Sequence, residues 1–263
     1  MNKNTFTTVK LSKGEVSVYD FGEVKLHAYR TDDPLSDEVF SVEKNGRSVI
    51  IESPCFFDNE RALSDYVENM NVEGILIAYH AAGAKFLPGV KKYGTVSAKE
   101  YGEKGGGKAL IDNFTTAFGF AFDRSVHNIT EVLNEGKNTI AGIDFIITPN
   151  ADAYDIEIPE INAVYTHMLG HDCHSIVAGN AHADAIIAQL EGYIAKKVTL
   201  ILTSHYTPED LKDAETKIDY LNGLKTIAAK CKSAEEFKAE VKKNYPNYGG
   251  ENYLDMTANT FFA

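Results

Sequence analysis

Short runs rich in β-forming residues occupy the first fifty positions of the chain. They cover 15–22, 25–31, 38–44 and 47–53. The Asn-Gly pair at 45–46 predicts a hairpin between the last two runs. Apolar residues then recur at helical spacing over 59–71, and EGILIAYH at 73–80 is typical of a buried strand. Strand, helix and strand in this order predict a parallel pair of strands.

The second half again leads from β-rich segments into helices and a strand. Its predicted strands cover 138–150, 153–167 and 198–206, with a turn at Pro159. The predicted helices cover 108–122, 181–197, 208–232 and 233–246. Ser233 and Glu236 form a capping-box signature for the last of them. Because no linker or repeat separates the halves, we expect one α/β (α+β) domain over 1–263, built as a four-layer αββα sandwich.

Composition and charge exclude some classes of partner. The 263 residues are 44% hydrophobic and include 14 Tyr and 14 Phe, so a sizeable core is expected. A net charge of −12 argues against nucleic acid and against an anionic membrane as the main partner. Three dispersed cysteines without CxxC spacing predict neither a disulfide framework nor a structural zinc site. We therefore expect a cytoplasmic protein that binds a small molecule, and the aromatic tail at 251–263 could serve a homodimer.

Four segments of the chain resemble, in order and spacing, the metallo-β-lactamase fold superfamily. RSVIIESPCFFDN is similar to the strand that ends in an Asp-Thr-Gly-like turn, and ILIAYHAAGAKFLPG to the strand that carries His-x-His-x-Asp-His. FIITPNADAYDIEIPEINAVYTH is similar to the paired strands with the next His and the bridging Asp, and LILTSHYTPEDL to the last ligand strand. The resemblance covers roughly residues 40 to 210. It implies the αββα sandwich and a hydrolase site at one edge, where zinc ions generate a hydroxide nucleophile.

The resemblance also shows which ligands of the first motif are replaced. Tyr79 and Ala81 stand at the first two His positions, Gly83 at the Asp position and Ala84 at the last His position. His80 falls on an intervening position that the motif does not use as a ligand.

The later motifs keep one matching ligand. Ala151 occupies the next His position, and the bridging Asp falls on Met168, or on His167 with a one-residue slip. Only His205 matches a ligand position. Because one imidazole cannot hold two zinc ions, the standard motif predicts no metal and no other cofactor here.

The segment YTHMLGHDCHSI at 165–176 is the richest polar cluster, and it also weakly resembles the alkylsulfatase branch of the superfamily. Histidine serves as a metal ligand or as a base near pH 7. We therefore consider a relocated site that could hold zinc or iron. Its catalytic candidates are His80, His171, Asp172, His174 and His205. The candidates for lining the pocket are Tyr79, Asp152, His167 and Cys173.

The sequence is compatible with two functions. The first is a diverged hydrolase whose metal site is non-standard or absent. The second is a metal-free small-ligand-binding or regulatory protein on the same scaffold. It is supported by Ala and Gly at the ligand positions, because these residues open space instead of coordinating a metal. Whether the chain is an enzyme is undecided, and hydrolysis is the activity to test first.

A glycine run at 101–110 (YGEKGGGKAL) raises the alternative of a phosphate-binding loop. Gly102, Gly107 and Lys108 satisfy Gly-x-x-x-x-Gly-Lys, but Ala109 replaces the Ser or Thr that contacts Mg²⁺ in a phosphate-binding loop. The preceding residues are also not a buried strand. We therefore predict a flexible loop near the pocket mouth.

Overall fold

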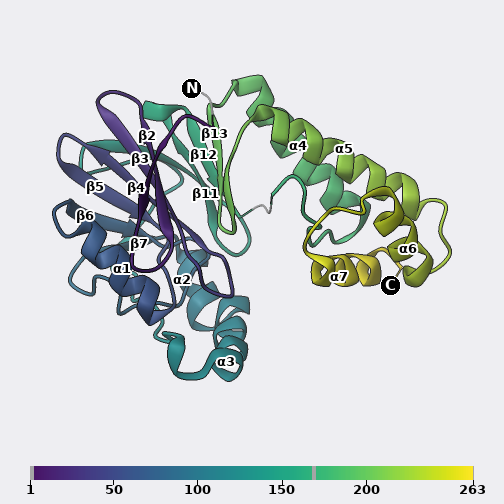
Figure 1. Ribbon diagram of the computed structural model, residues 1–263, viewed down its shortest axis with the longest axis horizontal. Helices are drawn as coiled ribbons and strands as arrows, with labels where there is room; N and C mark the ends of the chain where they lie inside the picture. The colour runs from purple at the N-terminus through teal and green to yellow at the C-terminus, as the bar shows by residue number, and fades with distance from the viewer. Residues whose placement is uncertain (1–2, 168–169, 263) are drawn as a thin grey trace. The chain divides into compact units, whose positions relative to one another are not determined.

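The computed structural model describes residues 3–167 and 170–262. Contacts between residues divide the chain into two compact units, residues 1–167 with 202–208 and residues 168–201 with 209–263. The first unit holds nearly all of the β-structure, and the second is mostly helical (Figure 1). A single domain over 1–263 stays a prediction.

Within the described residues, the first sheet has eight strands in the order β1 to β8. Its strands are β1 (Thr7–Lys10), β2 (Glu15–Asp20), β3 (Val24–Arg30), β4 (Glu38–Lys44), β5 (Arg47–Ile51), β6 (Asn71–Leu76), β7 (Lys92–Gly94) and β8 (Glu131–Val132). β1 to β5 pair antiparallel, and β5 pairs with β6 in parallel across helix α1 (Phe57–Val67). The predicted hairpin is confirmed, because Asn45 and Gly46 adopt φ of 52° and 71° in the two-residue turn.

The second sheet has, in the part of the chain that the structure describes, six strands in the order β14-β13-β12-β11-β10-β9. Its strands are β9 (Gly136–Ile140), β10 (Ile143–Pro149), β11 (Tyr154–Ile158), β12 (Ala163–Thr166), β13 (Leu200–Thr203) and β14 (Tyr206–Glu209). Pro159 opens a 3₁₀ turn, η2 (Pro159–Ile161), so the predicted turn is confirmed.

The strand predicted over 198–206 ends earlier than expected, at Thr203. Ser204 and His205 form a turn into β14, which takes up Pro208 and Glu209. Helix α5 (Leu211–Ala228) therefore begins three residues later than predicted, with Asp210 as its N-cap.

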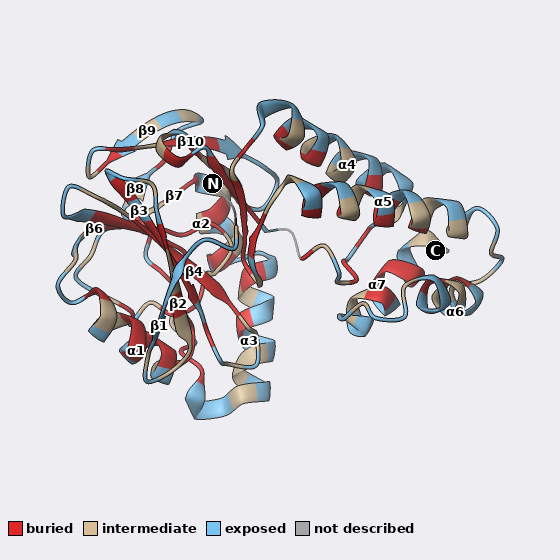
Figure 2. Ribbon diagram, turned by 45° about the horizontal axis from the view of Figure 1, so that its top comes forward, coloured by how far each residue is buried: buried red, intermediate tan, exposed pale blue. Residues whose placement is uncertain are grey.

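The two sheets face each other in the first unit, and their facing side chains form the core (Figure 2). Phe40 on β4 and Tyr165 on β12 are fully buried and meet edge to face with ring centroids 6.0 Å apart. The mixed α/β architecture with two packed sheets agrees with the predicted fold class.

The prediction of a flexible loop over 101–110 is wrong. Helix α2 (Val96–Glu103) ends there, and helix α3 (Gly106–Phe118) begins almost at once, followed by a 3₁₀ turn, η1 (Gly119–Ala121). A side chain at Gly107 would lie 2.7 Å from the ring of Tyr101. The glycines therefore allow two helices to join closely around that ring.

The second unit holds helices α4 (Gly179–Lys196), α5, α6 (Ala234–Asn244) and α7 (Glu251–Phe261). One of the two hydrogen bonds of the predicted capping box of α6 forms, since the Glu236 amide donates to Ser233 Oγ. The Glu236 carboxylate accepts from the Lys232 amide instead of from the Ser233 amide. The aromatic tail packs down as α7, where Phe261 stacks on Phe237. Among the described residues, every helix is too short or too polar to cross a bilayer.

Candidate functional site

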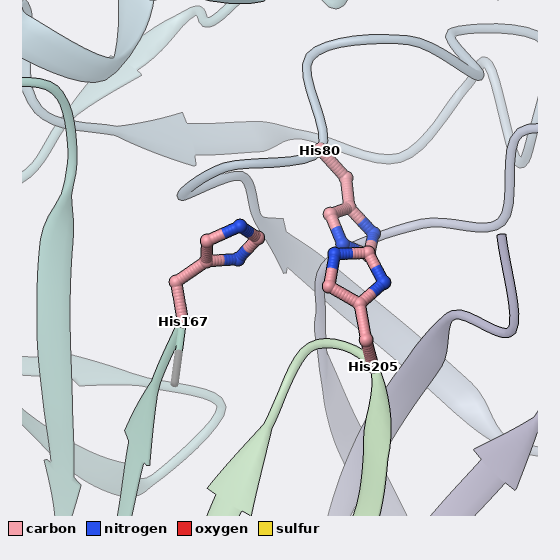
Figure 3. Close-up of side chains that lie close together, drawn as sticks. All are labelled: His80, His167 and His205. Carbon is pink, nitrogen blue, oxygen red and sulfur yellow. The ribbon is translucent and has the colours of Figure 1, made fainter. Parts of the chain in front are cut away.

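Three imidazoles converge at one edge of the first unit (Figure 3). His80 follows β6, His167 follows β12, and His205 lies in the turn between β13 and β14. One nitrogen atom from each ring lies within 4.8 Å of the others, as in a site that holds a metal ion. The three segments meet because each comes directly after a buried strand of the sandwich.

Each of the three rings has a polar neighbour at its Nδ1 atom. The Ser53 carbonyl oxygen lies 3.3 Å from His80 Nδ1, and Ser204 Oγ lies 2.8 Å from His167 Nδ1. Asp37 Oδ1 lies 3.0 Å from His205 Nδ1. Such contacts fix the ring orientation and direct Nε2 toward an ion. Among the described residues, the buried Nε2 of His80 has no hydrogen-bond partner, so this donor set fits a divalent ion.

Asp37 is the counter-charge of the site and is almost fully buried. Its Oδ1 atom is 4.0 Å from His80 Nε2, and its Oδ2 atom accepts from the Cys55 thiol at 3.4 Å. Burial by itself would raise the pKa of Asp37, but the nearby imidazoles of His80 and His205 outweigh it and lower that pKa. Burial alone would likewise lower the pKa of His80, whereas the carboxylates of Asp37 and Glu52 raise it on balance.

A stacked tyrosine sets the plane of the His167 ring. Tyr79 and His167 lie parallel with ring centroids 4.3 Å apart, and Asn150 donates to the Tyr79 hydroxyl at 2.7 Å. Desolvation, and then the imidazoles of His205 and His80, hold the pKa of His167 well below its usual range, although part of the residue is exposed to solvent. A neutral imidazole is the form that binds a metal ion.

Glu52 anchors the segment that carries His80. It is fully buried, and its carboxylate accepts from the backbone amides of Ala78, Tyr79 and His80 at 3.3, 2.7 and 3.0 Å. The Tyr165 hydroxyl donates to the same carboxylate at 2.6 Å. These bonds fix the turn after β6 and satisfy a charge that would otherwise be costly to bury.

Known proteins resemble this chain at the level of structure. No protein-family model matches the sequence, and no curated protein is found as a relative. Many solved structures are similar, among them the following three. A stereoselective inverting sec-alkylsulfatase, Pisa1 from Pseudomonas sp., has 14% identity, a TM-score of 0.65 and coverage of 95% of this chain and 50% of its own.

The other two structures are matched over more than nine tenths of their own length. A metallo-β-lactamase family protein from Thermus thermophilus shows 13% identity and a TM-score of 0.62 over 91% of both chains. The metallo-β-lactamase FIM-1 from Pseudomonas aeruginosa, in a mono-zinc form, shows 12% identity and a TM-score of 0.54 over 80% of this chain and 96% of its own. The chain has the metallo-β-lactamase fold. It spans about half the length of the alkylsulfatase that it matches.

The loop after β6 is tightly packed at Ala81 and Gly83, two positions that the resemblance aligned with ligands. Ala81 is buried in an apolar cluster that includes Phe56, Ile111 and Phe122. Gly83 has φ of +89°, and a Cβ atom there would lie 2.2 Å from the Pro54 carbonyl oxygen. His80 is therefore the side chain of this loop that joins the group of imidazoles.

The structure places the predicted residues in two groups. His80, His205, Tyr79 and His167 come together in the first unit. Asp152 lies exposed in the turn between β10 and β11, outside the group of imidazoles. Met168, the other position aligned with the bridging acid, lies outside the described residues.

The remaining predicted residues, His171, Asp172, Cys173 and His174, belong to the second unit. His174 is buried and its Nδ1 lies 2.9 Å from the Tyr220 hydroxyl. Burial raises the pKa of the Cys173 thiol, which opposes a role as nucleophile.

His171 is one of three residues in a second group with metal-ligand atoms close together, the others being Glu209 and Asp213. Glu209 Oε1 accepts from the His171 backbone amide at 2.7 Å and lies 2.8 Å from its Nδ1. These bonds tie His171 to the N-terminal end of α5 within the second unit.

Sequence reasoning missed the residues that surround the imidazoles: Asp37, Glu52, Ser53, Tyr165 and Ser204. A signal was present for Glu52, which directly follows the apolar run of β5. A second signal was Ser204, because it directly follows β13 beside a predicted ligand. Polar residues at the carboxyl ends of buried strands are common at the sites of α/β proteins.

Proposed function

We propose that this protein is a hydrolase-like member of its fold, with a non-standard centre in which His80, His167 and His205 hold one divalent ion such as zinc or iron. The observation that carries the proposal is the approach of three imidazole nitrogens within 4.8 Å. Three protein ligands with an open fourth position are typical of catalytic zinc sites. One of the similar solved structures, FIM-1, is itself described in a mono-zinc form.

The bound ion would supply Lewis acidity and a nucleophilic water near neutral pH. The chain's own residues prepare that centre. Asp37 balances positive charge beside His205, Glu52 holds the backbone at His80, and Tyr79 keeps the His167 ring in place. The substrate class that follows is a small molecule with an ester, lactone, thioester or sulfate bond, as hydrolases of this fold suggest.

Metal analysis of untagged protein is the direct test. We expect about one equivalent of zinc or iron per chain, and hydrolysis of at least one of those four bond types. Replacing His205 with Ala should abolish both, whereas His182→Ala, on the exposed side of α4, should change neither. Substoichiometric zinc, iron and manganese without hydrolysis would contradict the proposal.

A metal-free binding protein is the second candidate, and one observation favours it. Asp37 lies between two imidazoles, so the charges of this cluster are balanced without an ion. This function predicts that small ligands raise the melting temperature of protein treated with chelator, and that added zinc does not. A tightly bound metal at His205, seen by anomalous scattering, would contradict it.

A further inference from the structure

Four residues of the first unit form a continuous hydrogen-bonded chain that ends on one imidazole of the site. The Glu52 carboxylate lies 2.6 Å from the Tyr165 hydroxyl, which lies 2.6 Å from Ser204 Oγ. Ser204 Oγ in turn lies 2.8 Å from His167 Nδ1. Glu52, Tyr165 and Ser204 are each fully buried, so water does not compete for the two bonds that join them.

The chemistry of the groups gives this chain a direction. Both Glu52 oxygens accept backbone amides, the pattern of an ionised carboxylate, which can only accept. Tyr165 must therefore donate its one hydroxyl proton to Glu52 and accept a hydrogen bond from Ser204. Ser204 then donates its hydroxyl proton to Tyr165, so its oxygen can only accept a hydrogen bond from His167 Nδ1.

We propose that Glu52, Tyr165 and Ser204 are positioning residues that act as a directional relay, holding neutral His167 with its proton on Nδ1 and its lone pair on Nε2. The hydrogen bond that one ring nitrogen of a neutral imidazole makes sets which of the two nitrogens carries the proton. Tyr79 supports the same state by holding the ring plane through stacking. The use of the free Nε2 for an ion rests on the proposed function, whereas the tautomer itself does not.

The tautomer can be measured without any metal. In ¹⁵N-labelled protein treated with chelator, long-range ¹H–¹⁵N spectra distinguish protonated from unprotonated ring nitrogens. We expect His167, identified by its loss in His167→Gln, to show a protonated Nδ1 and an unprotonated Nε2. The reverse assignment in the wild-type protein would overturn the relay.

Variants then test each link. Ser204→Ala removes the acceptor and should shift His167 at least partly to the Nε2–H form, whereas Ser204→Thr keeps a hydroxyl and should restore the wild-type state. Tyr165→Phe frees the Ser204 proton to turn toward Nδ1, so it should shift the tautomer in the same direction. Tyr66→Phe is the matched control, because it removes a tyrosine hydroxyl from His27 Nδ1 elsewhere in the unit.

The outcomes separate the relay from the metal centre. If the relay and the centre both hold, Ser204→Ala should also weaken zinc binding roughly 10- to 100-fold in a chelator competition. A tautomer that shifts as expected in protein that binds no zinc leaves the relay intact and removes the proposed function. A tautomer unchanged in folded Ser204→Ala and Tyr165→Phe overturns the relay, whatever the zinc affinity. Circular dichroism checks folding, and either variant alone suffices if the other does not fold.

Discussion

Asp37 Oδ1 lies 3.0 Å from His205 Nδ1 and 4.0 Å from His80 Nε2, so one buried carboxylate faces two of the three imidazoles. The residue stands directly before β4, far from both histidines in the sequence. Its charge compensates the imidazoles, and its oxygen orients the ring of His205. The site therefore depends on a residue that binds no metal in the proposed centre.

Replacing Asp37 with Asn should weaken zinc binding roughly 10- to 100-fold, because the shape is kept while the orienting charge is lost. Isothermal titration in a competing chelator measures the change. Asp58→Asn is the matched control, since Asp58 lies exposed on α1. Equal affinities for the two variants would show that Asp37 does not tune the centre.

The stack between Tyr79 and His167 gives a second prediction. Tyr79→Ala should remove the surface that holds the imidazole plane and lower zinc affinity about tenfold, whereas Tyr79→Phe keeps the ring and loses the bond to Asn150 alone. The same chelator competition separates the two variants. If Phe proves as harmful as Ala, the hydroxyl bond and not the stack is responsible.

Gly83 gives a prediction on stability. With φ of +89° and the Pro54 carbonyl oxygen 2.2 Å from a built Cβ, Gly83→Ala should lower the free energy of unfolding by about 2–4 kcal/mol. Urea unfolding of chelator-treated protein measures it. Gly89→Ala is the control, because no atom lies within 4 Å of its built Cβ. A change below about 0.5 kcal/mol at Gly83 would mean that the loop after β6 adapts freely.

The sequence allows prediction of strands but not of the partners that strands bring together. The runs at 15–22, 25–31 and 38–44 are strands in the structure, because residues that favour a pleated and largely buried surface are concentrated in them. Tyr165 and Glu52, by contrast, are 113 positions apart and meet through sheet packing. A local sequence pattern cannot predict a contact between residues so far apart in the chain.

The glycine run and the imidazoles show the same limit in two ways. A run of three glycines is typical of a loop, but packing around the ring of Tyr101 decides for two helices. His80 and His205 could be chosen as candidates because each follows an apolar strand. The sequence could not predict whether His167 or His171 is the third imidazole of this group. The two residues are four positions apart but belong to different units.

Glu60 on α1 gives a prediction of pH dependence. Burial, and then the nearby charge of Asp123, raise the pKa of Glu60 from 4.5 to about 8. The native state therefore binds more protons than the unfolded state between these values, so the free energy of unfolding should fall as pH rises through them. Glu60→Gln should flatten this slope and gain about 1–3 kcal/mol at pH 8. Urea unfolding between pH 5 and 8.5 measures the slope. Glu68→Gln, at the exposed end of the same helix, should leave the slope unchanged, and equal slopes for Glu60→Gln and the wild-type protein would contradict the assignment.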